Sequence, residues 1–270
     1  MDTLFLFLGK GKMLDKYMDN YEVVKKSFGI QAEKFASYHM SKAEYTDYLI
    51  KRTAAKGNEH VLEVAAGTCI CGRALAPHVK EITCLDLTEE MLEQGKMLAM
   101  KSGLHNISFQ TGNAEALPYA DNTFDLVITR LSLHHFTNPK KPFEEMTRVL
   151  KRGGRLIVWD MEATSEALRN MDDAIEKMRD PSHTRILSRK EFEELFEKDF
   201  LLQCEESTLI PVNLKSWMEL TNTCAQVQNE ITDLMRQDLK GGNKTGFAPY
   251  LKESQIFFNH RWLLLIGVKK

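Results

Sequence analysis

Short apolar runs alternate with amphipathic segments through the middle of the chain, and this alternation predicts its fold class. The apolar runs that we interpret as strands are 60–65, 81–87, 107–110, 124–130, 155–160, 200–206 and 256–268. Strands that alternate with helices favour right-handed crossovers and a mostly parallel sheet. The long apolar run at the end suits an antiparallel strand that completes the sheet. We therefore expect an α/β fold with a doubly wound, mostly parallel seven-stranded sheet of the Rossmann-like kind.

Apolar residues at helical spacing predict helices between and around these strands. The segment from about 30 to 56 is expected to be helical, and another helix starts within 138–142 and ends at Gly153. A third helix is marked by Leu168, Met171, Ile175 and Met178. Ser188 followed by Glu191 forms a capping box, which predicts the start of a further helix.

This pattern divides the chain into a core and additions to it. Residues 57–206 are expected to form the α/β core, with a helical insertion at about 161–187, and residues 256–270 are expected to supply its final strand. Residues 1–56 are predicted to be N-terminal helices that act as a lid, and residues 207–255 a cap on the substrate side. Ligands of doubly wound sheets bind beyond the carboxyl ends of the strands, so binding residues are sought there.

Composition and charge exclude several classes of protein. Of the 270 residues, 43% are hydrophobic and 27% are charged, as in an ordinary globular protein, and the formal net charge is −2. That charge gives no strong attraction for nucleic acid or an anionic membrane. The apolar run around Leu4 is far shorter than the ~20 residues of a membrane span and lacks the features of a secretory signal. We therefore expect a cytoplasmic protein with no membrane span and no nucleic-acid partner.

The cysteines are predicted to be reduced structural thiols. Their number, five, is odd and the chain is long, which argues against a disulfide framework. Cys69 and Cys71 form a C-x-C pair, and no second pair follows at a spacing that suits tetrahedral zinc. No bound metal is expected.

The turn after the first strand carries the first sign of a ligand. A P-loop would place Lys after Gly72, but Arg73 stands there, and the G-x-G-x-x-G fingerprint of dinucleotide sites is also missing. Small residues such as Gly67 let the backbone approach a ligand closely. Asp86 stands nineteen residues beyond Gly67, where the second strand ends and a carboxylate can accept both hydroxyls of a ribose. A ribose site without a phosphate site indicates a nucleoside that lacks phosphates, and S-adenosylmethionine is the common one.

Four ordered motifs resemble those of a known family. They are VLEVAAGT from Val61, CLDLTEEML from Cys84, GNAEALPYADNTFDLVITRLSLHHF from Gly112 and VLKRGGRLIV from Val149. Together they resemble the successive motifs of class I S-adenosylmethionine-dependent methyltransferases, most closely the ubiquinone/menaquinone-biosynthesis methyltransferase-like group. The resemblance implies an enzyme that moves a methyl group from S-adenosylmethionine to a small-molecule acceptor by direct displacement, leaving S-adenosylhomocysteine.

The resemblance also implies a set of cofactor-binding residues. The set is Glu63, Ala65, Ala66, Gly67, Asp86, Leu87, Asn113, Ala114, Arg130 and Leu131. Within it, Asp86 is expected to bind the ribose, Asn113 the adenine edge, and Arg130 the methionine part. Ala65 and Cys69 stand where the family prefers glycine, which questions the shape of the turn, and Asn113 replaces the more common aspartate.

No catalytic residue is required, because the methyl group of a sulfonium is already electrophilic. A general base is needed only if the acceptor must lose a proton. His134 and His135 follow the fourth strand and are the candidates for that base; the alternative is that they pack locally. Candidate substrate-side residues are Phe35 and Tyr38 as a lid, and His183 and Arg185 in the insertion, where a structural turn is the alternative interpretation.

Two other functions are compatible with the same pattern. An NAD(P)-dependent oxidoreductase would share the acidic residue Asp86, although the dinucleotide fingerprint is absent. A non-catalytic S-adenosylmethionine-binding protein would keep the nucleoside site without transferring the methyl group. The acceptor, the methylated atom and the oligomeric state are not determined by the sequence.

Overall fold

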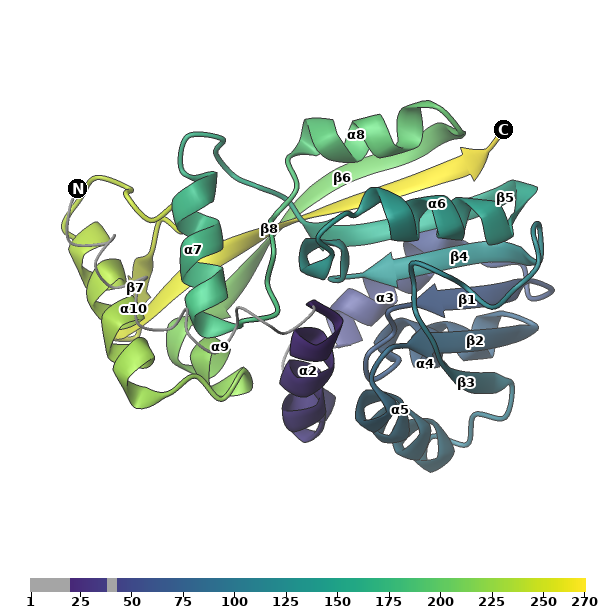
Figure 1. Cartoon of the computed structure of the whole chain (residues 1–270), viewed down its shortest axis with the longest axis horizontal. Helices are drawn as coiled ribbons and strands as arrows, with labels where there is room; N and C mark the ends of the chain where they lie inside the picture. Colours follow the sequence, from purple (N-terminus) through teal and green to yellow (C-terminus); the bar gives the residue numbers. More distant parts are fainter. Residues whose placement is uncertain (1–19, 38–42) are drawn as a thin grey trace.

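The structure is a computed structural model that describes residues 20–37 and 43–270. Its centre is one sheet with the strand order β3-β2-β1-β4-β5-β8-β6, in which β7 pairs with β8 (Figure 1). The strands are β1 His60–Val64, β2 Glu81–Asp86, β3 Ile107–Thr111, β4 Phe124–Arg130, β5 Leu150–Met161, β6 Phe200–Asn213, β7 Tyr250–Lys252 and β8 Gln255–Lys269. The helices are α2 Asn20–Ser37, α3 Ala43–Thr53, α4 Ile70–Leu75, α5 Glu89–Lys101, α6 Lys140–Val149, α7 Arg169–Arg179, α8 Arg189–Glu197, α9 Leu214–Leu220 and α10 Ala225–Asp238, with short 3-10 turns at Ala76–His78 and Leu133–His135.

The strand directions confirm the predicted fold class. Strands β1 to β5 are parallel, β8 is antiparallel to β5, and β6 is antiparallel to β8. The predicted number of seven strands was wrong, because residues 250–252 fold back on β8 as an eighth, short strand. This segment, Tyr-Leu-Lys, is too short and too polar to stand out as an apolar run.

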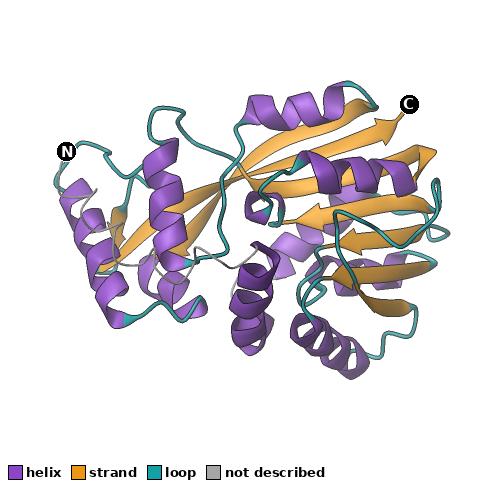
Figure 2. Cartoon of the chain, viewed as in Figure 1, coloured by secondary structure: helices purple, strands orange, loops and turns teal. Residues whose placement is uncertain are grey.

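Helices cover both faces of the sheet, and each face has its own core (Figure 2). On one face, Phe143 and Met146 of α6 and Phe192 and Phe196 of α8 pack on the central strands. On the other face the core includes Leu49 of α3 together with residues of α4 and of the strands. Because helices cover both faces of the sheet, side chains on both sides of each central strand are buried. The strand segments are therefore apolar at nearly every position.

A second, smaller core lies beyond the end of the parallel strands. Strands β6 and β8 pair along their whole length, from Phe200 opposite Lys269 to Asn213 opposite Phe257, and continue well past β5. Around the far half of this ribbon, α7, α9 and α10 gather an apolar cluster that includes Trp217 and Phe258 (Figure 1). From here on, the cap means α7, α9, α10 and the far half of β6 and β8. It is larger than the cap predicted for residues 207–255, because it includes α7 and part of β8.

Several predicted boundaries differ from the observed ones. The boundary between 206 and 207 falls inside β6, because this strand runs on into the cap. The helix expected over 30–56 is two helices, α2 and α3, and α2 begins at residue 20. The helix expected to reach Gly153 ends at Val149, since Leu150 already pairs with Phe124 in the sheet. The capping box of Ser188 and Glu191 is confirmed at the start of α8.

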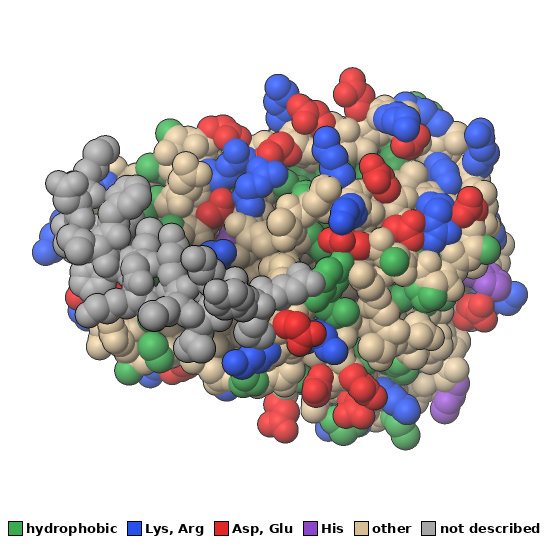
Figure 3. All heavy atoms as spheres, viewed as in Figure 1, with side chains coloured by type: hydrophobic (Ala, Val, Ile, Leu, Met, Phe, Trp, Pro, Cys, Tyr) green, Lys and Arg blue, Asp and Glu red, His purple; other side chains and the backbone are tan. Residues whose placement is uncertain are grey.

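In the face shown in Figure 3, acidic and basic side chains are interspersed over the described residues. Of the helices in the described part of the chain, none combines the length and apolarity that a membrane crossing requires.

Candidate functional site

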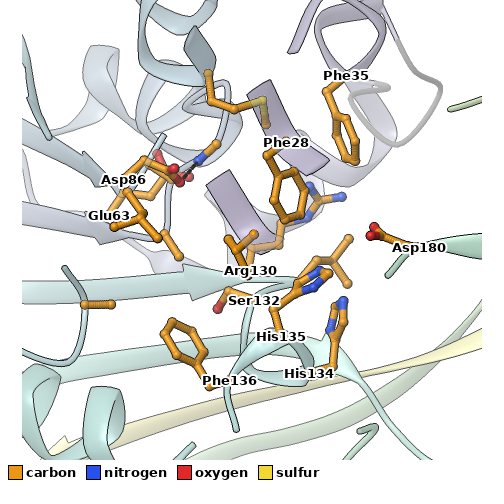
Figure 4. A pocket seen from close by; sticks show the side chains of 18 of the residues that line it. Phe28, Phe35, Glu63, Asp86, Arg130, Ser132, His134, His135, Phe136 and Asp180 are labelled. Carbon is orange, nitrogen blue, oxygen red and sulfur yellow. Dashed lines mark hydrogen bonds between the residues drawn. The ribbon is translucent and has the colours of Figure 1, made fainter. Parts of the chain in front are cut away.

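A cavity of about 520 Å³ lies between the carboxyl ends of the parallel strands and the cap. The ends of β1, β2 and β4, helix α2, and residues of α7, α9 and β8 all contribute to its lining (Figure 4). It sits at the point where the strand order reverses, between β1 and β4. This is the place where doubly wound sheets bind ligands.

The turn after β1 is built from backbone in the left-handed region. Ala65 has φ 52°, Gly67 has φ 53° and Cys69 has φ 57°. The left-handed region costs a residue with a Cβ roughly 1–2 kcal/mol. The glycine-like shape of the turn is therefore kept even though alanine and cysteine stand at two of its positions. A Cβ on Gly67 would also lie only 3.1 Å from Cε of Met91, so this position has little room for a side chain.

Glu63 fixes the turn from below. Its carboxylate is buried, and its two oxygens accept the backbone N–H groups of Cys71 (3.2 Å) and Gly72 (2.7 Å) at the start of α4. Burial raises the pKa of Glu63, and the N–H groups oppose this rise. The side chain lies at the cavity wall, and its carboxylate holds the turn and α4 together.

Asp86 links the end of β2 to the turn after β1. Its Oδ2 accepts the N–H of Gly67 at 2.7 Å, and its Oδ1 accepts the N–H of Thr88 at 2.8 Å. Burial raises the pKa of this carboxyl group, while the two N–H groups favour its charged form. Each oxygen accepts two or more hydrogen bonds in general, so both keep capacity for a ligand hydroxyl at the cavity wall. Leu87 follows directly and also lines the cavity.

The expected adenine side contains a contact that sequence reasoning missed. Asn113 lies at the cavity with Ala114, and its side chain exchanges hydrogen bonds with the hydroxyl of Tyr21 in α2 at 3.0–3.2 Å. Its Oδ1 also accepts the N–H of Glu115 at 2.8 Å. The position of Tyr21, ninety-two residues earlier, gave no local signal of this contact.

The end of β4 places Arg130 and Leu131 in the cavity wall. Leu131 has φ 50° and donates its N–H to the carbonyl of Trp159 at 2.9 Å, so the chain turns sharply after the strand. The guanidinium of Arg130 lies over the rings of Trp159 and Trp262, 5.3 Å and 4.9 Å from their centroids. Burial lowers the pKa of Arg130, and nearby acidic groups oppose the change.

His134 is held by a buried carboxylate at the end of β5. Its Nδ1 lies 2.6 Å from Oδ1 of Asp160, and Oδ2 of Asp160 accepts the N–H groups of Ser132 (2.9 Å) and Leu133 (2.7 Å). Burial acts to lower the pKa of His134, but the charge and hydrogen bond of Asp160, together with the charge of Glu176, raise this pKa. The predicted site residues did not include Asp160, which orients the whole turn through these contacts.

The pKa of His135 shifts in the opposite direction to that of His134. Its Nδ1 lies 3.2 Å from the carbonyl oxygen of Ser182 and 3.1 Å from its hydroxyl. Burial, followed by the charge of His134, lowers the pKa of His135 to about 3, so the ring is neutral near pH 7. Both histidines line the cavity, as the candidate bases should.

The substrate-side candidates divide into two groups. Phe35 lines the cavity from α2, together with Phe28, whose ring centroid is 5.6 Å away. Tyr38 lies outside the described residues. His183 and Arg185 are not brought to the cavity lining: His183 is buried against Asp173 at 2.8 Å, and Arg185 pairs with Glu191 on the outside. Both side chains are used to hold the segment between α7 and α8.

Comparison with known proteins agrees with this geometry. The family described as "Methyltransferase domain" matches residues 55–235. The uncharacterized methyltransferase YcgJ of Bacillus subtilis is 32% identical over 225 residues, covering 82% of this chain and 89% of its own. Its crystal structure has a TM-score of 0.76 at 28% identity and covers 86% of this chain and 99% of that one. A putative methyltransferase from Bacillus halodurans gives the same TM-score and identity, covering 83% and 98%.

The fold and the site together define a class I S-adenosylmethionine-dependent methyltransferase. The chain belongs to the methyltransferase-domain family. The ubiquinone/menaquinone biosynthesis C-methyltransferase UbiE of Zymomonas mobilis is a further relative, 32% identical over 120 residues, but these cover only 44% of this chain and 50% of that enzyme.

The strained turn gives a first prediction. Ala65→Gly should stabilise the protein by about 0.5–1 kcal/mol. Glycine adopts a positive φ without the strain that alanine bears, and this gain is partly offset because glycine loses more conformational entropy on folding. Thermal unfolding should show a rise of a few degrees at most. Ala66→Gly is the matched control: Ala66 is buried and is not among the residues with positive φ, so that change should destabilise. A loss of stability in both variants would contradict the assignment of strain to Ala65.

The buried thiols give a second prediction. Glu63, Cys69 and Cys84 present ligand atoms within 4.8 Å of one another, a grouping that could hold a metal ion. Burial raises the pKa of Cys84 well above its usual value, which favours the neutral thiol over the metal-binding thiolate. Protein purified without added metal should therefore contain much less than one zinc per chain by elemental analysis. One equivalent that survives dialysis would show the cluster to be a metal centre.

The two neighbouring histidines should titrate differently. By NMR, the ring of His134 should have a pKa above the usual 6.5, and that of His135 should stay neutral from pH 5 to 8. Because the folded pKa of His134 is raised, its ion pair with Asp160 stabilises the fold fully below about pH 6.5, and this stabilisation is lost as the pH rises through the raised value. If His135 instead has the higher pKa of the two, the contact with Asp160 does not determine which ring is protonated.

Proposed function

We propose that this protein transfers a methyl group from S-adenosylmethionine to a small-molecule acceptor bound between the sheet and the cap. The observation that carries this proposal is Asp86: a buried carboxylate at the end of β2 whose oxygens each hold one backbone N–H and line the cavity. A carboxylate so placed suits the two hydroxyls of a ribose. The glycine-like turn beside it leaves room for a nucleoside and offers no phosphate site.

The residues present fit the rest of the methyl donor. Asn113 and Ala114 line the side beyond β3 where the adenine would lie, and Leu87 supplies an apolar surface beside it. Ala65, Ala66 and Gly67 form a floor of small residues, and Arg130 and Leu131 line the end of β4 where the methionine part would lie. The volume of about 520 Å³ falls in the range of ordinary ligand cavities, roughly 300–1,000 Å³.

The bound donor supplies an electrophilic methyl group, so the chain has to align the two reactants and exclude water. Such alignment contributes up to ~7–11 kcal/mol in favourable cases. The left-handed turns at Ala65 and Leu131 bring the backbone to the cavity from the ends of β1 and β4. His134 is the group placed to take a proton from the acceptor, since its Nδ1 is held by Asp160 and the part of the chain described here gives its Nε2 no partner. Above its pKa, Nε2 can accept that proton.

The identity of the acceptor does not follow from the relatives. YcgJ is uncharacterized, and the match to UbiE leaves more than half of this chain uncovered. The cap forms the acceptor side of the cavity, and the acceptor is set by the residues of that site and not by the fold. A small molecule suits a cavity of about 520 Å³ between two cores better than a polymer does.

Binding of S-adenosylhomocysteine tests the proposal directly. Calorimetry should show one site per chain in the wild-type protein, and Asp86→Asn should weaken the affinity roughly ten- to a hundredfold, because a charged acceptor to the ribose is lost. Asp125→Asn is the matched control, since Asp125 also accepts a backbone N–H, from His60, but at the opposite end of the sheet. NADH should give no stabilisation in thermal unfolding. Equal affinity in the Asp86 variant would place the ribose elsewhere, and stabilisation by NADH alone would favour an oxidoreductase.

A further inference from the structure

A second buried carboxylate lies at the opposite, cap-side end of the cavity. Asp180 follows α7, is 1% exposed, and lines the same cavity as Asp86. Its Oδ1 accepts three hydrogen bonds: from the hydroxyl of Ser27 (2.9 Å), and from the N–H (3.0 Å) and the hydroxyl (2.6 Å) of Ser182. Among the residues that the structure describes, none gives a hydrogen bond to its Oδ2. Figure 4 shows this carboxylate turned toward the space beside Phe28, Phe35 and His135.

Among the described residues, no cation forms a direct ion pair with Asp180. Burial alone would raise its pKa, but the neighbouring His135 and Arg179 and the bonds from Ser182 keep the pKa below its usual range, so the group is ionised. The guanidinium of Arg179 is itself paired with Glu176 at 3.2 Å and lies over the ring of Trp217. The ring of His135 is linked to Asp180 through the hydroxyl of Ser182, which lies 3.1 Å from Nδ1 of His135 and donates to the carboxylate.

The other ionisable groups near this end of the cavity pair with one another. Glu176 faces Arg179 and His260, and His134 faces Asp160. The hydrogen bonds given to Asp180 come from hydroxyl and N–H groups alone, so no cation in the described part of the chain is bonded to this carboxylate. A buried carboxylate that is not balanced by the protein is costly unless a ligand balances it.

Aromatic rings form the wall around this carboxylate. The ring centroids of Phe28 and Phe35 lie 5.6 Å apart, with 58° between the ring planes. Those of Phe28 and His135 lie 5.0 Å apart in an edge-on arrangement. Trp217 lines the cavity from the cap. The faces of aromatic rings attract cations, most strongly where water is excluded. Ser27 connects the two parts, because it precedes Phe28 in α2 and donates to Asp180.

We propose that Asp180, with Phe28 and Phe35, forms a subsite for a positively charged ammonium group carried by the methyl acceptor. This inference rests on the proposed function only in that the ligand is taken to be the acceptor. The subsite is separate from the residues expected to hold the methyl donor: Asp86 and Asn113 lie at the ends of β2 and β3, whereas Asp180 lies between α7 and α8. The ammonium group is a recognition group here, and no step of its chemistry is implied.

Three probes that share one aromatic body test the charge preference. Binding of 2-phenylethylamine, 2-phenylethanol and phenylacetate is measured by calorimetry with the protein saturated with S-adenosylhomocysteine. The amine should bind at least about tenfold more tightly than either other probe, because its cation gains a charge-assisted hydrogen bond in a dry site. Tighter or equal binding of phenylacetate overturns the proposal, and equal binding of phenylethanol overturns it in favour of a neutral hydroxyl group.

Variants then locate the preference. Asp180→Asn retains an oxygen that can accept from Ser27 and Ser182, so the fold and the affinity for S-adenosylhomocysteine should persist while the preference for the amine falls about tenfold. Asp173→Asn is the matched control: Asp173 pairs with His183 outside the cavity lining, and the preference should remain. An unchanged preference in Asp180→Asn contradicts the assignment.

A further variant protects the test against misfolding. If Asp180→Asn does not fold, Phe35→Leu serves instead; it keeps an apolar side chain but removes a ring, and it should weaken binding of the amine more than binding of phenylethanol. An equal loss of affinity for both probes would show that the ring of Phe35 only packs against the ligand. Failure of the wild-type protein to bind S-adenosylhomocysteine would refute the proposed function, whereas normal binding of that nucleoside without a preference for the amine would refute only the ammonium subsite.

Discussion

The pairing of β6 with β8 is the constraint on which the rest of the molecule depends. Because β8 enters between β5 and β6, it closes the parallel sheet, and because it continues to Phe257, it carries the cap as well. Trp262 lies at the middle of this strand and meets Arg130 and the core, while Phe258 lies further along in the cap. One strand thus runs through both the donor side and the acceptor side of the cavity.

Within that frame, buried carboxylates fix the irregular backbone of the site. Glu63, Asp86, Asp160 and Asp180 each accept backbone N–H groups from a turn at the cavity, and each is almost fully buried. A buried carboxylate is tolerated only where such donors meet it. Three of these side chains lie at the ends of parallel strands, so the sheet positions the acids and the acids shape the turns.

Much of the core was predictable from the sequence, and the acceptor side was not. The strand runs and Asp86 could be recognised because periodicity and strand ends are local signals, visible within a few residues. The contacts of Tyr21 with Asn113 and of Ser27 with Asp180 join residues about a hundred or more positions apart, and no local pattern marks them. His183 was a substrate-side candidate because it lies in the insertion after the fifth strand, but its partner Asp173 is supplied by the preceding helix. The extra strand β7 was missed since its three residues pair only through the geometry of β8.

Helix α2 reaches both ends of the cavity, and this has a thermodynamic consequence. Tyr21 bonds to Asn113 on the nucleoside side, and Ser27, less than two turns further along the same helix, bonds to Asp180 on the cap side. A rigid helix cannot shift at one of these contacts without disturbing the other. If occupation of either end moves α2, the two ligands must change each other's affinity by the same factor, since such coupling is reciprocal. The affinity for one reactant then depends on whether the other is bound.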